Sequence, residues 1–120
     1  PRNTTAQTIP ATIEQQAIRP VDTFPPKSAV SVVIGQKDTS YATIPVTFNG
    51  GDGQTLVRNI TVRMTRSDGR VITSNLNPEN GAEVTLEGTR GTDRVEVFVT
   101  YYSGKTLLIA DRDISFRALG

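Results

Sequence analysis

The sequence predicts an all-β protein in which two antiparallel sheets pack face to face. From Ala29 onward, apolar and polar residues alternate with a period of two, which is the pattern of strands with one buried face. Clusters of Gly, Asn, Asp and Ser separate the apolar runs at close spacing, and no helical pattern interrupts them. Seven to eight short strands in about 90 residues indicate an immunoglobulin-like antiparallel β-sandwich.

The successive runs justify these strands in chain order. Residues 29–35 and 41–48 alternate first, and residues 59–65 then place Ile60, Val62 and Met64 on one face. Residues 82–86 form a short strand, residues 94–111 form a hairpin, and residues 113–119 close the chain. The core expected from this alternation consists of Val32, Val46, Ile60, Val62, Val97, Val99, Leu108 and Phe116.

The hairpin in residues 94–111 carries apolar residues on both faces, so it belongs in the centre of a sheet. A two-residue turn at residues 103–104 predicts that Val97 faces Ala110. It also predicts the pairs Phe98 with Ile109, Val99 with Leu108, Arg94 with Asp113 and Glu96 with Asp111. The pairing of two carboxylates is unfavourable, so we expect Arg112 to relieve it or the strand pairing to end there.

The segment "RSDGR" at residues 66–70 predicts a second hairpin turn. A two-residue loop would set Met64 opposite Thr73 and mix the buried and exposed faces. A three-residue loop, with Gly69 left-handed and forming a bulge, sets Met64 opposite Ile72. We expect the second arrangement, because register follows the buried face.

Residues 1–28 differ from the rest and are expected to form an extended Pro-rich tail, followed by a sandwich domain at residues 29–120. Five of the seven prolines precede position 27, and such termini are commonly extended. Four apolar residues are unusual in a solvated spacer, which makes them candidate assembly contacts: Ile9, Ile13, Ile18 and Phe24. We expect part of residues 5–24 to dock on a sandwich, either its own or that of a neighbouring subunit.

Composition limits the function. The 120 residues suit one domain, and the net charge of +1 from 13 basic and 12 acidic residues gives no basic field for nucleic acid. No apolar segment approaches the roughly 20 residues of a membrane span, so any membrane contact is expected only through a segment that this chain does not contain. The absence of His and Cys removes the usual catalytic triads, disulfides and zinc sites. We therefore expect neither an enzyme nor a cofactor.

A few stretches could carry chemistry. "NGGDGQT" at residues 49–55 lacks the Lys-Ser/Thr of a phosphate-binding loop and predicts a loop between strands. Asp111 and Asp113 share a strand face near Glu96, but they fall short of the six or so oxygen ligands of calcium, so we expect no metal. Asn3 and Asn59 begin N-glycosylation sequons. Tyr101 and Tyr102 are candidates for a binding platform, with one half-buried and the other a cross-strand partner.

From Pro25 to Phe116 the layout resembles the extracellular domain of archaeal type IV pilin-like proteins, especially those of methanogens. The segments that carry the resemblance are "PPKSAVSVV", "TFNGGDG", the "DGR" turn and "LEGTRGTDRVEVFVTYYSGKTLLIADRDISF". The most specific part is the G-x-D-x-V-x-V run at residues 91–97. The resemblance implies a hydrophobic helix ahead of the sandwich, and that helix is missing from this sequence.

The sequence thus favours a non-catalytic structural protein. It would be a pilin-like extracellular domain, or a filament or envelope subunit at the cell surface, which associates with itself or with another cell-envelope protein. The alternative is an immunoglobulin-like binding module. Such a module would recognise glycan, S-layer or another protein through loops such as 49–55 and 78–82.

Overall fold

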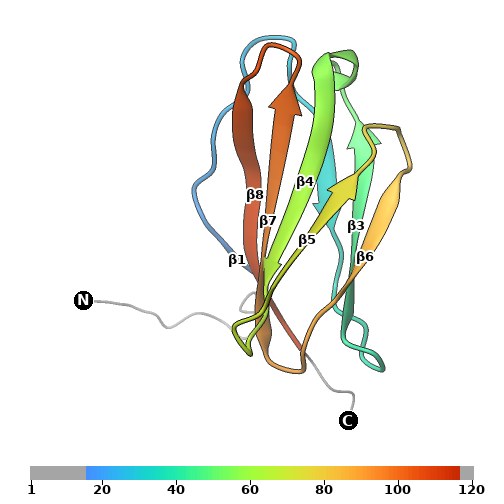
Figure 1. Cartoon of the computed structure of the whole chain (residues 1–120), viewed down its shortest axis with the longest axis vertical. Coiled ribbons are helices and arrows are strands. Elements are labelled where there is room, and N and C mark those ends of the chain that lie inside the picture. The colour runs from blue at the N-terminus through green and yellow to red at the C-terminus, as the bar shows by residue number, and fades with distance from the viewer. Residues whose placement is uncertain (1–15, 117–120) are drawn as a thin grey trace, which may run out of the picture.

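The structure is a computed structural model that describes residues 16–116, with the backbone alone at residues 16–18. It confirms the all-β sandwich: eight antiparallel strands in the described part form a five-stranded sheet of order β1-β8-β7-β4-β5 and a three-stranded sheet of order β2-β3-β6 (Figure 1). The strands are β1 (Gln16–Ile18), β2 (Ser31–Ile34), β3 (Thr43–Gly50), β4 (Val57–Thr65), β5 (Val71–Leu76), β6 (Glu83–Glu87), β7 (Thr92–Tyr101) and β8 (Thr106–Ser115). No helix in the described part is long and apolar enough to cross a membrane.

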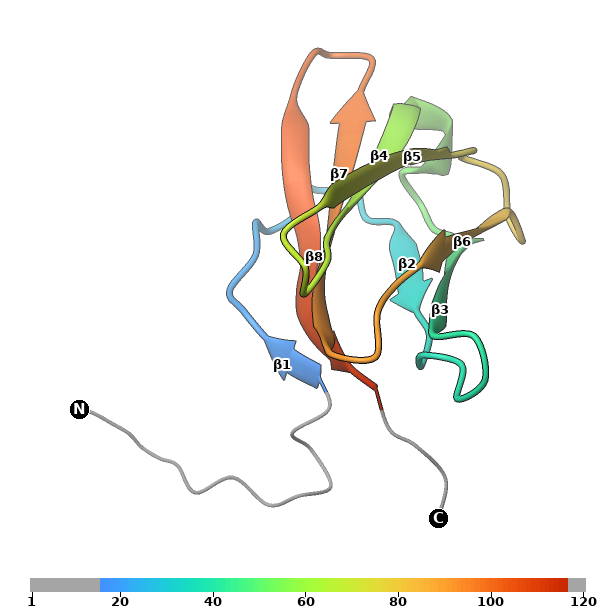
Figure 2. The same cartoon turned by 60° about the horizontal axis from the view of Figure 1, so that its bottom comes forward.

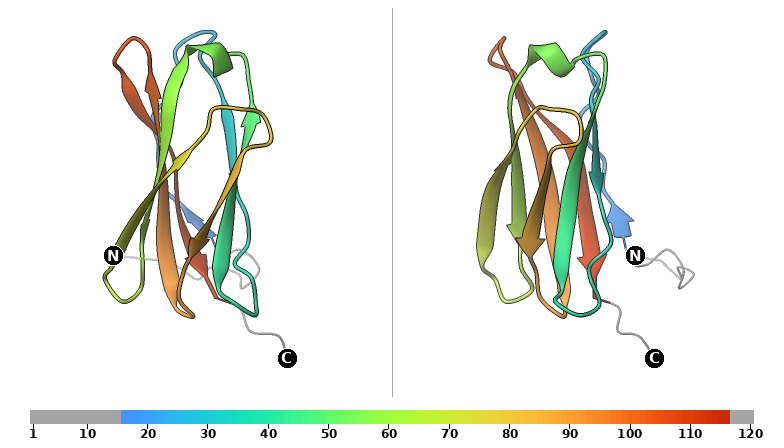
Figure 3. Two further views of the ribbon diagram at one scale, coloured as in Figure 1. Left: turned by 45° about the vertical axis from the view of Figure 1, so that its right-hand side comes forward. Right: turned by 90° about the vertical axis from the view of Figure 1, so that its right-hand side faces the viewer.

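The two sheets face each other with their strands roughly aligned, and Figure 3 shows the pair from the side. The connections gather at two ends. We call "upper end" the connections at residues 25–30, 51–56, 77–82 and 102–105, and "lower end" those at residues 35–42, 66–70 and 88–91. Strand β1 and the end of β8 lie at the lower end, as the view in Figure 2 shows.

The core lies between the sheets and is built from the inward residues of β3, β4 and β7. Side chains with no exposed surface include Ile44, Val46, Phe48, Ile60, Val62, Met64, Val95, Val97 and Val99. From Ile60 to Thr65, buried residues of β4 alternate with more exposed ones, as the period of two in the sequence predicted. Five of the eight core residues named from the sequence, Val46, Ile60, Val62, Val97 and Val99, are thus confirmed as fully buried.

The other three expected core residues are only half-buried. Val32 packs against the core from the edge strand β2. Leu108 is displaced by a register shift in the β7–β8 pairing, where Val97 pairs with Ala110 as predicted but Phe98 pairs with Leu108. The extra residue is Ile109, so Leu107 takes the buried position opposite Val99 and Leu108 faces outward.

Phe116 follows the end of β8 instead of belonging to a separate closing strand. Its ring lies under the Arg90 guanidinium, 4.9 Å from the ring centroid. The backbone N–H of Phe116 donates to the carbonyl of Gly91 at 3.2 Å. Residues 106–115 form one strand, so residues 113–115 belong to β8, and the separate strand predicted at residues 113–119 is not found among the described residues.

The turn between β7 and β8 has three residues, so the predicted two-residue turn at Ser103-Gly104 is wrong. The N–H of Tyr101 donates to the carbonyl of Lys105, and the N–H of Gly104 donates to the carbonyl of Tyr101, both at 2.9 Å. Gly104 has φ +94°, the left-handed conformation that a three-residue loop with a glycine bulge requires. The longer loop and the bulge at Ile109 together set the register of the buried face.

The β4–β5 turn forms as the sequence predicted. Met64 pairs with Ile72, Gly69 has φ +92°, and Arg66 and Arg70 close the loop through an N–H···O bond of 2.8 Å. The prediction succeeded because the choice between two turns was decided by which register kept the buried face intact.

The described part of the N-terminal segment lies along β8 of its own chain. Strand β1 pairs antiparallel with β8, with Ala17 opposite Asp113. The segment then runs up toward the upper end, where Asp22 N–H donates to the carbonyl of Leu108 at 2.9 Å. Phe24 packs against the core. Docking on its own sandwich, one of the two arrangements expected from the sequence, is therefore what the structure shows for residues 16–24.

Candidate functional site

A pocket that could hold a ligand lies at the upper end of the described part of the chain. It has a volume of about 370 Å³, and its wall consists of Pro25, Ser28, Leu56, Tyr101, Tyr102, Ser103 and Lys105. These residues come from three segments: the 25–28 turn, the connection between β3 and β4, and the β7–β8 hairpin. The volume falls within the range of small-ligand pockets, and the wall is mainly apolar as such pockets usually are.

The two tyrosines of the pocket have different roles. Tyr101 is buried, and its hydroxyl donates to the carbonyl of Ser28 at 2.6 Å; burial also raises the pKa of this hydroxyl. Tyr102 lies in the hairpin loop with 69% of its surface exposed, beside Leu56 with 46% exposed. The sequence-based expectation of a half-buried tyrosine and a cross-strand partner is therefore wrong for Tyr102, because the three-residue loop contains it. The ring of Tyr102 is therefore exposed to solvent at the pocket.

Backbone packing at the upper end explains the Gly-rich segment 49–55. The N–H of Gly53 donates to the carbonyl of Ala29 at 2.9 Å, and a Cβ on Gly53 would collide with the backbone of Ser28. The side-chain amide of Gln54 donates to the carbonyl of Pro78 at 3.3 Å, which joins this segment to the 77–82 connection. The glycines thus permit close packing of loops, and the segment places Leu56, in the short 3-10 helix η3 (Gln54–Leu56), at the pocket.

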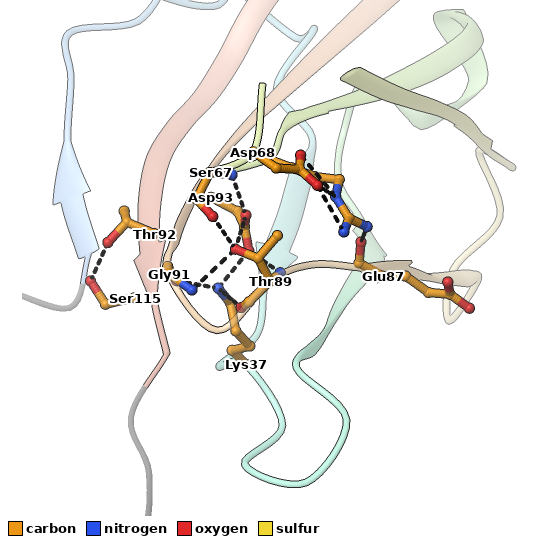
Figure 4. Close-up of polar contacts among 10 residues, drawn as sticks. Lys37, Ser67, Asp68, Glu87, Thr89, Gly91, Thr92, Asp93 and Ser115 are labelled. Carbon is orange, nitrogen blue, oxygen red and sulfur yellow. Dashed lines mark hydrogen bonds and ion pairs between the residues drawn. The ribbon is translucent and has the colours of Figure 1, made fainter. Parts of the chain in front are cut away.

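The lower end holds a buried ion pair between Lys37 and Asp93 (Figure 4). Neither side chain has any exposed surface, and the ammonium Nζ lies 2.5 Å from the carboxylate Oδ2. The same ammonium donates to the carbonyls of Thr89 and Gly91, each at 2.8 Å. Its three N–H donors therefore have three acceptors.

Asp93 is also fully hydrogen-bonded. Its Oδ1 accepts from the Ser67 N–H at 2.9 Å and from the Thr89 hydroxyl at 2.8 Å, and its Oδ2 accepts from the Thr89 N–H at 2.8 Å. Burial alone would raise the pKa of Asp93, but the Lys37 ammonium and these donors outweigh it and hold the pKa below its usual range. The pair links the β2–β3, β4–β5 and β6–β7 connections and has a structural role.

The third cluster lies on the outer face of the five-stranded sheet, the face turned away from the other sheet. Glu96 and Asp111 are paired across β7 and β8 as predicted. Three arginines neutralise them: Arg63 contacts Glu96 at 2.9 Å, Arg94 contacts Asp111 at 2.8 Å, and Arg19 contacts Asp111 at 3.3 Å. The strand pairing continues on both sides of Glu96 and Asp111, so the expectation that it ends there is wrong. The arginines explain how the two carboxylates coexist.

Hydrogen bonds from Arg94 hold the pKa of Asp111 below its usual range, against the effect of burial. An ionised carboxylate enclosed by guanidinium groups is a poor ligand for a cation and a poor proton donor. Within residues 16–116 no group of three or more Asp or Glu side chains is arranged to hold a metal ion.

The residues named from the sequence as sites are dispersed. Asn3, Ile9 and Ile13 lie outside the described residues, and for Ile18 the structure gives the backbone, which pairs with Arg112. Phe24 packs on the core near the upper end. Asn59 is half-buried on β4, and its amide nitrogen lies 3.4 Å from the hydroxyl of Thr61, the third residue of its sequon.

Sequence reasoning missed Lys37, Pro25 and Leu56. Lys37 follows the β2 strand in a polar stretch, and no local pattern distinguishes a buried lysine from an exposed one. Pro25 and Leu56 meet only because the 25–28 turn packs against the β3–β4 connection.

Comparison of the chain with models of known families, with curated proteins and with solved structures gave no match.

Proposed function

We propose that the chain is a non-catalytic module of a cell-surface or envelope protein that recognises a protein partner through its upper end. The observation that carries the proposal is the exposed pair of Tyr102 and Leu56 at an open pocket. Exposed aromatic residues in a pocket are typical anchors of protein recognition. The resemblance of residues 25–116 to the extracellular domain of archaeal pilin-like proteins supports the cell-surface setting.

The chemistry of the pocket favours an apolar anchor next to an acidic group. Lys105 lines the pocket, and Lys27 lies in the adjoining turn. No described carboxylate forms an ion pair with either lysine, whereas other basic side chains in the same structure do have acidic partners. The exposed surface of the wall is mainly apolar, which suits an apolar anchor better than a glycan. An acidic protein segment with an aromatic or aliphatic side chain fits best.

Small probes can test this recognition. We expect phenylacetate, indole-3-acetate and 4-methylpentanoate at millimolar concentrations to shift the amide NMR signals of Leu56, Tyr102 and Lys105. Phenylacetamide, which lacks the charge, should bind more weakly. Tyr102→Ala should weaken the binding of phenylacetate at least threefold, because the exposed ring supplies the apolar contact.

The matched control is Tyr41→Ala, which removes another exposed tyrosine, 82% accessible, at the lower end. It should leave the binding of phenylacetate unchanged. Shifts caused by a panel of oligosaccharides but not by the apolar acids would replace the protein partner with a glycan. Shifts from neither set of probes would refute recognition at this pocket.

The non-catalytic part of the proposal has a separate test. The chain contains no His or Cys, Lys37 has an acceptor for each N–H, and Asp111 is enclosed by arginines. We expect no turnover of ester, phosphate, glycoside, peptide or redox substrates above the buffer rate. Turnover that disappears in Asp111→Asn or Asp113→Asn would overturn this expectation.

A further inference from the structure

We propose that residues 16–24 exchange between copies of this chain, so that the segment of one copy pairs with β8 of another. This inference goes beyond the recognition proposed for the upper end and concerns the edge of β8, although the hinge at residues 25–28 also contributes Pro25 and Ser28 to the pocket. It rests on three features of the described residues: how the segment is held, how little of it is buried, and how its hinge is built.

The segment is held almost entirely by one strand. Besides the three-residue pairing with β8, the Arg19 N–H donates to the carbonyl of Asp111 at 3.2 Å. The Arg19 guanidinium contacts Asp113 at 2.6 Å, and the N–H of Leu108 donates to the carboxylate of Asp22 at 2.9 Å. Every copy of the chain has the same β8 strand, which can receive the segment of another copy. Exchange therefore preserves each of these contacts.

Little of the docked segment is buried. Pro20, Val21, Asp22 and Thr23 are exposed, and Arg19 is half-buried. Phe24 alone among residues 19–24 packs against the core. Few contacts must break before the segment leaves, and departure exposes the N–H and C=O groups along the β8 edge. An unpaired edge of this kind accepts a strand from another chain.

The hinge at residues 25–28 favours the open form, in which residues 16–24 have left β8 of their own chain. Residues 25–28 make a tight turn in which the Ser28 N–H donates to the carbonyl of Pro25 at 3.1 Å. Lys27 has φ +61°, and after Pro26 this is the conformation of a type II turn, whose third position favours Gly or Asn. A lysine there is disfavoured, while two consecutive prolines favour an extended chain. Short hinge loops under strain promote strand exchange.

The exchange has two geometries. Two copies that exchange segments reciprocally form a closed dimer, whereas copies that each donate to the next form an open chain. The second geometry would give a filament. Both place the segment of one copy against β8 of another, so one experiment detects both.

Cysteine cross-linking tests the exchange directly, because the chain has no cysteine of its own. Ala17 and Asp113 are backbone partners across β1 and β8, at a separation that a disulfide can span. We would mix Ala17→Cys and Asp113→Cys chains in denaturant, refold them together at high concentration and oxidise them. We expect a covalent heterodimer, identified by its mass, at several times the yield of an Ala17→Cys and Ser103→Cys mixture. Equal yields would overturn the proposal.

The hinge provides a second measurement that leaves the acceptor strand intact. Lys27→Gly relieves the left-handed strain of the closed turn, so it should lower the oligomeric fraction seen by light scattering at a fixed concentration. Arg70→Gly, a change to an exposed basic residue at the lower end, should leave that fraction unchanged. A wild-type chain that stays monomeric at every concentration, even after refolding, would contradict exchange whatever the upper end binds.

Discussion

Val97→Asp is expected to unfold the protein. Val97 lies in the middle of β7, between β4 and β8, with no exposed surface. An aspartate there would have to bury a charge among apolar side chains or be expelled together with its strand. The cost of several kcal/mol is comparable with the whole stability of a domain of this size, about 5–15 kcal/mol. Far-UV circular dichroism should show loss of the β-sheet signal, and thermal melting should lose its cooperative transition.

The control is Thr100→Asp on the same strand. Thr100 is half-buried on the outer face, where its hydroxyl lies 3.0 Å from that of Thr106. The new carboxylate can reach water, so Thr100→Asp should retain the wild-type spectrum and lose at most about 1 kcal/mol. A folded Val97→Asp protein that melts near the wild-type temperature would show that the core does not lie where β7 meets β4 and β8.

The sequence predicted the core of the sandwich because a buried face imposes a local pattern. The alternation along residues 59–65 identified three fully buried residues of β4, and the same reasoning selected the correct β4–β5 turn. The prediction of strand register failed in the β7–β8 hairpin, where two local deviations compensate each other. The β7–β8 turn is one residue longer than predicted, and the bulge at Ile109 absorbs one residue on the other side. Residues 107–110 are all apolar, so the sequence does not show where the inward and outward positions of β8 exchange at the bulge.

The candidate sites were less predictable than the core, because they depend on contacts between distant segments. The upper pocket needs the 25–28 turn, η3 and the β7–β8 loop to meet. Lys37 meets Asp93, 56 residues further along the chain. A lysine in a polar stretch normally remains in water, so nothing in the sequence near Lys37 indicated that it would be fully buried.

Lys37→Met is expected to destabilise the protein by about 3–5 kcal/mol, the usual cost of removing one partner from a buried ion pair. Methionine approximates the length of the side chain but supplies no charge and no donor. The carboxylate of Asp93 then loses its counter-ion, and the carbonyls of Thr89 and Gly91 lose the donor that contacts them at 2.8 Å. Urea unfolding should show the loss, and the melting temperature should fall by roughly 10–20 °C.

The matched control is Lys105→Met, because Lys105 is exposed and has no ion-pair partner among the described residues. Its free energy of unfolding should change by less than about 0.5 kcal/mol. The double variant Lys37→Met, Asp93→Asn removes both charges, so it should lose less than the sum of the two single variants. A Lys37→Met protein whose free energy of unfolding lies within about 1 kcal/mol of the wild type would show that the ion pair of Lys37 and Asp93 contributes little to stability.

The pH dependence of Lys37→Met separates lost charge pairing from lost packing. The pKa of Asp93 is lowered in the folded state, so the ionised carboxylate contributes stability above its unfolded pKa of about 3.9. That contribution is lost as the pH falls through the lower, folded pKa. Lys37→Met lacks the ammonium that helps to lower this pKa, so it has less of this stability to lose. The difference in unfolding free energy between wild type and Lys37→Met should therefore narrow below about pH 4. A difference that stays constant from pH 7 to pH 2 would assign the whole effect to packing.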